Sequence, residues 1–300
     1  GPLTVEANLE RLVEDAVTMT QDSYSHLVWK HRFSPDQILD QLSAPTLSSV
    51  ISSLYTAYAR EEEAEGWICK ENKLFDHAHQ IRDHLPEAQF IYLCRDGRDV
   101  ACSMKDMPTH GQHAYALAKE WMHQQEKCLR VHQELQHKEK SILVRYEDLI
   151  TTPETVLERI CAFADLEYEK QMLYFHETEE AVKQAQKSEF WENLSKPVMS
   201  DNKGKFRRQL SSREIWIFEA VAGEFLDLLG YPLAHPPDER HLALWQRAFY
   251  RLRNVVQSTL KRQEMEDWDG RDARQATLTR IHNRSRSDPN STHAPRLTYE

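Results

Sequence analysis

Residues 88–104, AQFIYLCRDGRDVACSM, decide the fold. The apolar run from Phe90 to Leu93 predicts a buried parallel strand, because short apolar runs bounded by turn residues are typical of such strands. The strand ends at Arg95, and a helix that carries Ser103 is predicted after the turn. Such a turn gathers free backbone N–H groups and the positive end of the helix dipole. The guanidinium of Arg95 and the hydroxyl of Ser103 add hydrogen-bond donors there, so the segment predicts a site for a phosphate monoester. The alternative is that Arg95 lies on the surface and that Ser103 only faces a neighbouring helix residue.

A second unit of strand and helix is predicted at residues 141–166, SILVRYEDLITTPETVLERICAFADL. An apolar triplet supplies the strand. Thr152 then precedes Pro153, and a threonine N-cap followed by proline at the first helical position is a typical helix start. Apolar residues at helical spacing follow. Taken alone, this pattern leaves Tyr146 as an aromatic residue of the core or its rim.

Residues 193–211, NLSKPVMSDNKGKFRRQLS, form a polar, cationic stretch before a helix predicted to begin at Ser211 or Ser212. Charge runs are usually solvated. Here Gly204 lies inside the run, where the backbone must approach another group closely or adopt a positive φ. The basic residues of this stretch are Lys196, Lys203, Lys205, Arg207 and Arg208.

These three segments resemble the nucleotide-binding segments of sulfotransferases that use 3′-phosphoadenosine 5′-phosphosulfate (PAPS). The resemblance implies that Arg95 and Ser103 hold the 3′-phosphate of the nucleotide. VRYEDL before a proline-started helix matches the family segment whose tyrosine, here Tyr146, lies near the adenine. Phe206 stands where the family commonly has a tryptophan that packs on the purine. The basic residues implied to close over the nucleotide are Lys205, Arg207 and Arg208.

The apolar segment 67–69 predicts a short strand that ends at Lys70. Sulfotransferases place a catalytic lysine at such a strand end, where it stabilises charge on the bridging oxygen as the sulfuryl group leaves. The alternative is a lysine that extends into solvent, because the next residues, Glu71 and Asn72, depart from the family pattern. Asn72 replaces the histidine base of cytosolic members and cannot take a proton. By analogy with tyrosylprotein sulfotransferases, whose base is a glutamate, the nearest candidate base is Glu6.

The family's loop for the 5′-phosphosulfate is missing from this sequence. No two of its eight glycines lie within six residues of each other, so the pattern G-x-x-x-x-G-K-[ST] cannot occur. No turn similar to Arg-Ser-Gly-Thr is found either. We therefore expect a chain truncated before that loop, with little or no sulfuryl transfer by residues 1–300 alone.

The resemblance covers residues 65–232 and implies an α/β fold, a parallel sheet flanked by helices. The expected fold is the P-loop-NTPase-like sulfotransferase fold, truncated at its N-terminus, with helical insertions and a C-terminal helix. We expect a sulfotransferase-like domain at 1–235, helical up to residue 62. A helical extension is expected at 236–266 and a disordered tail at 267–300, which is rich in Arg, Asn, Ser and Pro.

The implied activity is transfer of a sulfuryl group from PAPS, as co-substrate, to a hydroxyl or amine, without a metal. The sequence identifies no acceptor. One alternative is a non-catalytic sulfotransferase-like module that binds a nucleotide or serves as a scaffold. Another is a P-loop kinase-type phosphotransferase, although the sequence has neither a Walker lysine nor a clear Walker-B acid.

Composition restricts the partners and the location. The net charge of −10 and the pI near 5.9 argue against nucleic-acid binding. No apolar run approaches the roughly 20 residues of a membrane span. The five cysteines contain no C-x-x-C pair and predict reduced thiols. His110 and His113 complete no metal motif, so no metal site is expected. We expect a cytoplasmic protein, or a lumenal one if a missing N-terminal segment targets or anchors it; the oligomeric state stays open.

Overall fold

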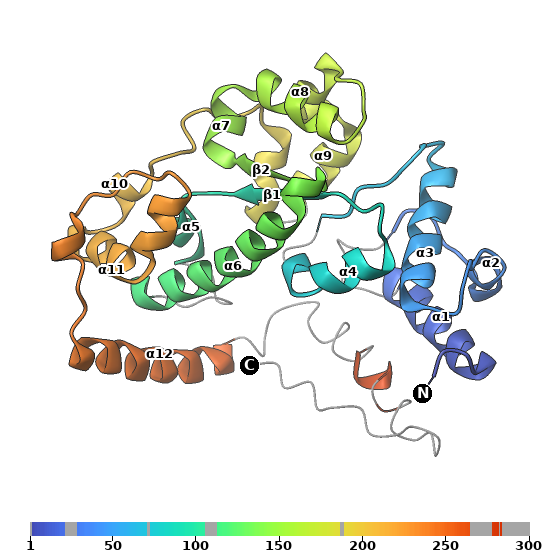
Figure 1. Ribbon diagram of the computed structural model, residues 1–300, viewed down its shortest axis with the longest axis horizontal. Coiled ribbons are helices and arrows are strands. Elements are labelled where there is room, and N and C mark those ends of the chain that lie inside the picture. Colours follow the sequence, from blue (N-terminus) through green and yellow to red (C-terminus); the bar gives the residue numbers. More distant parts are fainter. Residues whose placement is uncertain are drawn as a thin grey trace. The chain divides into compact units, whose positions relative to one another are not determined.

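The computed structural model describes residues 2–21, 29–70, 73–105, 113–186, 189–264, 278–281 and 283 (Figure 1). The chain divides into two compact units, one of residues 1–71 with 268–300 and one of residues 72–267. Glu71, Asn72 and His110 lie outside the described residues, as does most of the tail for which disorder is predicted.

The first unit contains three helices, α1 (Glu6–Gln21), α2 (Pro35–Leu39) and α3 (Leu47–Glu61). Helix α2 begins with a capping box in which Ser34 and Gln37 bond each other's backbone N–H groups. The helices pack their apolar faces together, as the predicted helical organisation requires. The buried residues of this core are Val13, Val17, Phe33, Ile38, Val50, Leu54 and Ala57.

The predicted strand that ends at Lys70 is wrong: residues 67–70 form no strand in this structure. Instead, the ring of Trp67 stacks on Tyr55 of α3, with 4.7 Å between the ring centroids. Ile68 is exposed rather than buried between strands. A triplet of apolar residues is too short to distinguish a strand from a segment held by one aromatic contact.

The second unit is built on two parallel strands, β1 (Phe90–Cys94) and β2 (Ser141–Arg145). The register pairs Cys94, the last residue of β1, with Arg145, the last residue of β2. Each strand runs almost directly into a helix, β1 into α5 (Gly97–Met104) and β2 into α7 (Tyr146–Thr151). Both predicted strands and the helix after Arg95 are therefore confirmed, and the α/β fold class with them. The burial predicted for the first strand is wrong, because Ile91 and Leu93 are 41 % and 53 % exposed.

Helices α6 and α8 pack against these strands, Figure 1 shows α6 running along one side of them, and further helices complete the second unit. The α-helices are α4 (Ala78–His84), α6 (Ala114–Leu135), α8 (Pro153–Phe163), α9 (Glu179–Ala185), α10 (Phe206–Gln209), α11 (Ser212–Leu228) and α12 (Leu244–Glu264). The short 3-10 helices are η1 (Leu74–Asp76), η2 (Gln136–Lys138), η3 (Lys170–Glu177), η4 (Glu189–Ser195) and η5 (Pro237–Glu239).

The main core of this unit lies between β1, α5, α6 and α11. Gly97 starts α5 at the point of closest packing, because a Cβ atom there would lie 2.5 Å from the Trp121 ring and 2.7 Å from Phe218. Only glycine allows these rings to approach the backbone so closely. The segment singled out in the sequence thus turns from strand to helix against a tightly packed core.

The predicted helix ends are partly confirmed. Pro153 is the first residue of α8, as predicted, but the Thr152 hydroxyl caps no N–H group and donates to the Asp148 carbonyl at 3.2 Å. Helix α11 begins at Ser212 with Ser211 as N-cap. The helix is followed by Gly230 at a φ of 75°, the left-handed conformation expected of a C-terminal glycine.

Candidate functional site

The carboxyl ends of the two strands bring Arg95 and Tyr146 together. Each is the first residue after its strand, and parallel neighbouring strands end at the same edge of a sheet. The Arg95 guanidinium carbon lies 4.4 Å from the centroid of the Tyr146 ring, a cation–π contact. Two segments that lie about 50 residues apart in the sequence therefore meet as the resemblance implied.

The cationic stretch before α10 joins the same place through Asn202. Arg95 Nη2 donates to the Asn202 carbonyl oxygen at 2.9 Å. The side-chain amide of Asn202 donates to the Tyr146 hydroxyl at 2.6 Å. The Arg95–Tyr146–Asn202 cluster thus unites the three segments predicted to bind one ligand. Asn202 was not singled out in the sequence, and a polar residue two positions before Gly204 was its only signal.

Arg95 keeps one donor without a partner. Its Nε atom is buried and has no hydrogen-bond partner in the part of the chain that the structure describes. A buried donor without a bond costs roughly 1–3 kcal/mol, and more when the group is charged. The backbone at this position is held by Trp121, whose indole N–H donates to the Arg95 carbonyl at 3.2 Å. The free donor on a fixed backbone suits a bound anion.

A second arginine at this edge was also missed by the sequence analysis. Arg145 ends β2, and its Nε is likewise buried without a partner among the described residues. Its guanidinium carbon lies 4.6 Å from the centroid of the Tyr231 ring. A basic residue at the end of an apolar strand was the signal for it.

Three basic side chains act on the Cys102 thiol of α5. Burial raises the pKa of the Cys102 thiol to about 11, and Asp99 acts in the same direction, whereas the charges of Arg95, Lys105 and Lys205 lower it. Arg95 and Lys205, which lie more than 100 residues apart in the sequence, therefore both act on the same thiol. Lys105 is engaged elsewhere, since its Nζ lies 2.6 Å from Glu214 Oε1.

Asp99 holds the cationic stretch against α5. Its buried carboxylate accepts hydrogen bonds from the backbone N–H of Gly204 at 2.6 Å and of Phe206 at 2.9 Å. Gly204 adopts a φ of 68°, which confirms the positive φ predicted for it. The two bonds fix the loop that supplies Asn202 and Lys205, and sequence reasoning had treated Asp99 only as part of a turn.

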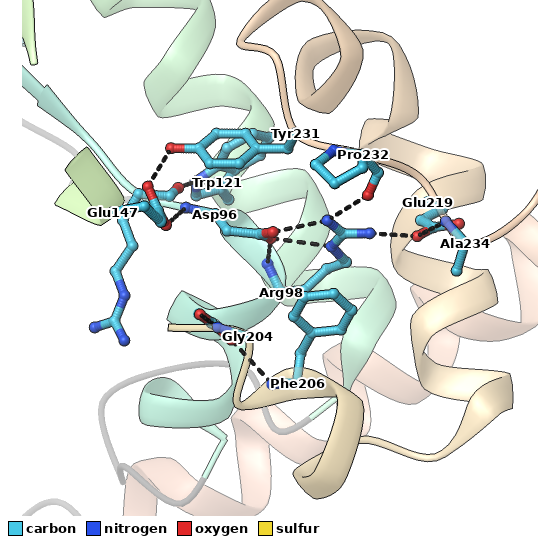
Figure 2. Close-up of polar contacts among 12 residues, drawn as sticks. Asp96, Arg98, Trp121, Glu147, Gly204, Phe206, Glu219, Tyr231, Pro232 and Ala234 are labelled. Carbon is cyan, nitrogen blue, oxygen red and sulfur yellow. Dashed lines mark hydrogen bonds and ion pairs between the residues drawn. The ribbon is translucent and has the colours of Figure 1, made fainter. Parts of the chain in front are cut away.

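A buried ion network lies beside this loop (Figure 2). Figure 2 shows the Arg98 guanidinium between Asp96 and Glu219. Arg98 Nη2 lies 2.7 Å from Asp96 Oδ2 and donates to the Pro232 carbonyl at 2.9 Å, and Nη1 lies 2.5 Å from Glu219 Oε1. Because all three charged groups are buried, each depends on the others for solvation.

The network reaches the strand ends through Glu147 of α7. The backbone N–H of Asp96 donates to Glu147 Oε1 at 2.9 Å, and the Tyr231 hydroxyl donates to Glu147 Oε2 at 3.0 Å. The turn after β1 is thereby tied to the helix after β2. The cluster above it rests on a rigid support, which a precise binding site requires.

Stability should depend on pH through Glu219. Its burial opposes ionisation, but hydrogen bonds from the Ala234 N–H, His235 and Arg98 keep the pKa of its carboxyl below the usual value. A lowered folded-state pKa stabilises the fold above the unfolded value of about 4.3, and this contribution disappears as the pH falls further. Glu219→Gln should therefore lower the free energy of unfolding at neutral pH. The difference in this free energy between the parent and the variant should become smaller as the pH falls.

Urea denaturation at several pH values measures that gap. The control is Glu224→Gln, which changes an exposed glutamate of the same helix, α11. We expect a change within about 0.5 kcal/mol for this control at every pH. If the difference in free energy of unfolding between the parent and Glu219→Gln stays constant into acid, Glu219 is not ionised in the folded protein as we expect.

The other residues expected to bind the nucleotide lie on α5 and α10. Ser103 is exposed, and its hydroxyl donates to the Asp99 carbonyl at 3.4 Å, a weak bond within the helix. Arg207 and Arg208 are exposed on α10. The expected packing of Phe206 on a purine is wrong for this structure, because its ring is 3 % exposed and lies beneath a guanidinium.

The two residues expected to act in catalysis lie in the first unit. Glu6 is exposed in the first turn of α1, and Lys70 is exposed at the end of the irregular segment 67–70. The residues expected to bind the nucleotide all belong to the second unit. The structure thus brings Arg95 and Tyr146 into contact, and the roles of all these residues stay predictions.

Comparison with known proteins gives the family. The model of a family described as the sulfotransferase family matches residues 4–170, which is more than half of the chain. A search of curated proteins found no match. Among the residues that the structure describes, no helix is both long and apolar enough to cross a membrane. The chain belongs to the sulfotransferase family, and its activity is of the sulfotransferase type.

Proposed function

We propose that this protein binds PAPS at the Arg95–Tyr146–Asn202 cluster and transfers its sulfuryl group to a hydroxyl or amine of an acceptor. The observation that carries the proposal is the buried Nε of Arg95, which has no partner among the described residues, at the point where three predicted nucleotide-binding segments meet. An arginine fork with a spare donor is suited to a phosphate monoester.

In this proposal Arg95 and Ser103 hold the 3′-phosphate. The Ser103 hydroxyl can exchange its long bond to the Asp99 carbonyl for a shorter one to a phosphate oxygen, which is the better acceptor. Tyr146 remains partly exposed beside Arg95, so ring area is left for contact with adenine.

Basic residues of α10 and its N-cap complete the proposed nucleotide site. Lys205, like Arg95, acts electrostatically on the Cys102 thiol, and the exposed side chains of Arg207 and Arg208 are long enough to turn toward a polyanion. The loop that carries them is fixed at its base by Asp99. The loop can therefore present cations without losing its position.

For the transfer itself, bound PAPS supplies an activated sulfuryl group whose bond to the bridging phosphate oxygen breaks as the acceptor attacks. Lys70 is proposed to stabilise the charge that develops on that oxygen. Glu6 is proposed to take the proton of the acceptor. Both roles rest on the family resemblance of the sequence.

We expect the chain to bind adenosine 3′,5′-bisphosphate at least about tenfold more tightly than AMP, because a charge-assisted bond to an anion contributes about 1.5–3 kcal/mol. Calorimetric titration of the full chain with the bisphosphate, AMP and ATP measures this preference. Equal affinity for the bisphosphate and AMP would refute the 3′-phosphate site, and a preference for ATP would favour a kinase-type protein. Tight binding of the bisphosphate without any transfer, even when the chain carries a loop for the 5′-phosphosulfate, would indicate a non-catalytic module.

A further inference from the structure

Helix α12 carries an apolar face that nothing in the second unit covers. Leu244, Trp245, Phe249 and Leu252 are between 53 % and 83 % exposed. On a helix with about 3.6 residues per turn, these four positions share one side. A single exposed leucine needs no explanation, but an aromatic and aliphatic stripe along one helix indicates a binding surface.

The opposite side of α12 is fixed to the second unit. Tyr250 is 3 % exposed, and its ring centroid lies 5.6 Å from that of Tyr115 in α6. Its hydroxyl accepts a hydrogen bond from Arg213 at 3.4 Å, and Leu242 is buried in the same small core. The helix therefore presents its apolar face in a fixed direction.

The helix is basic within an acidic chain. Its sequence holds five lysines and arginines and one acidic residue, whereas the whole chain has a net charge of −10. Three of the arginines are described and exposed: Arg253 flanks one edge of the apolar face, and Arg247 and Arg251 lie beyond the other. The apolar face is therefore bordered by cationic groups on both sides.

We propose that α12 binds the surface of a membrane that contains anionic lipid, with the helix axis parallel to the membrane plane. The apolar stripe would enter the boundary between headgroups and acyl chains, as amphipathic basic helices do. Trp245 suits the interface, since its ring is apolar and its N–H polar. The arginines at both edges can extend their aliphatic stems along the apolar surface and place their charges at lipid phosphates.

A membrane surface fits this face better than a protein partner does. A groove that encloses a helix needs most of its circumference, and the side of α12 that carries Tyr250 is already packed against Tyr115. A symmetric contact with a second copy would bring the arginines of the two helices close to one another. A planar anionic surface needs only the exposed side and matches its charge.

Flotation of the full chain with lipid vesicles tests the proposal. We expect binding to vesicles of phosphatidylcholine mixed with phosphatidylserine, weaker binding as salt rises, and none to phosphatidylcholine alone. The double variant Phe249→Ser, Leu252→Ser should lower the affinity for anionic vesicles at least about tenfold, because it removes two apolar side chains from the interface. Arg251→Gln with Arg253→Gln should lower it by a similar factor.

The matched control is Leu228→Ser, which changes a 64 % exposed leucine at the end of α11 and should leave vesicle binding unchanged. Circular dichroism checks that the variants keep the parent fold, as expected for exposed positions. The proposal is overturned if the parent chain does not bind anionic vesicles, or if the Phe249→Ser, Leu252→Ser variant binds them as the parent does. If the parent binds no vesicles, and light scattering shows that it is a dimer that the Phe249→Ser, Leu252→Ser variant no longer forms, the face binds a second copy of the chain instead. Capture by calcium-loaded calmodulin, used as an acidic helix-binding probe, without vesicle binding would assign it to a protein.

Discussion

Arg98→Ala should lower the free energy of unfolding by about 3–5 kcal/mol, the usual effect of removing one partner from a buried ion pair. The Arg98 side chain is fully buried and bonds the carboxylates of Asp96 and Glu219 and the Pro232 carbonyl. Alanine would leave two buried carboxylates without their countercharge and open a cavity beneath Phe206. Urea denaturation of the parent and the variant measures the difference.

The control for this prediction is Arg130→Ala. Arg130 is an exposed arginine of α6, and its Nη2 lies 3.4 Å from Glu126 Oε1, one helical turn away. Exposed pairs of this kind contribute about 0.3–0.5 kcal/mol, so the control should be close to the parent. A loss below about 1 kcal/mol for Arg98→Ala would show that the network is not what holds the turn after β1 to α11.

In a chain that also carries a loop for the 5′-phosphosulfate, Lys70→Ala should reduce the rate of sulfuryl transfer about a hundredfold or more, with little effect on nucleotide affinity. A charge that stabilises the leaving oxygen acts mainly in the transition state, and loss of one such group typically has an effect of this size. Single-turnover transfer at saturating PAPS, with an acceptor that the chain sulfates, measures the rate. Calorimetry with the bisphosphate measures the affinity.

Lys73→Ala is the matched control, because it removes another exposed lysine three residues along the chain. We expect this variant to transfer sulfuryl groups within a few-fold of the parent rate. The same result for Lys70→Ala would support the alternative of a lysine that simply extends into solvent, and would remove Lys70 from the mechanism.

The framework of the second unit could be predicted because its signals are local. Continuous apolar runs gave both strands, and the turn and cap residues after them gave the start of α5 and the first residue of α8. The prediction of a strand before Lys70 was wrong, because three consecutive apolar residues occur equally well in strands and in irregular segments. Trp67 there packs on a single ring of α3.

The support of the site could not be predicted, because it depends on contacts between distant segments. In sequence, Asp96, Arg98 and Asp99 look like an exposed polar turn, yet all three are buried. Arg98 is bound by Glu219 and Asp99 by the backbone of the loop at Gly204, each more than 100 residues away. Charge that is buried and fully paired leaves no local pattern in a single sequence.

The loop before α10 shows the same limit. Its cations and the positive φ of Gly204 could be read from composition. The aromatic ring at Phe206 was expected to face a ligand, but it fills the core beneath Arg98 instead. Asn202, which joins Arg95 to Tyr146, has no sequence feature that sets it apart from other polar loop residues.

The central claim is that Arg95 recognises the 3′-phosphate of the nucleotide. Its most direct test is the ratio of the affinities for adenosine 3′,5′-bisphosphate and AMP in the parent, in Arg95→Ala and in the control Arg130→Ala. Loss of packing around Tyr146 would lower the affinities for both nucleotides by the same factor. Only the loss of a contact with the 3′-phosphate changes the ratio of the two affinities. We predict a preference of at least about tenfold in the parent and the control, and a ratio near one in Arg95→Ala. A full preference retained by Arg95→Ala would contradict the account.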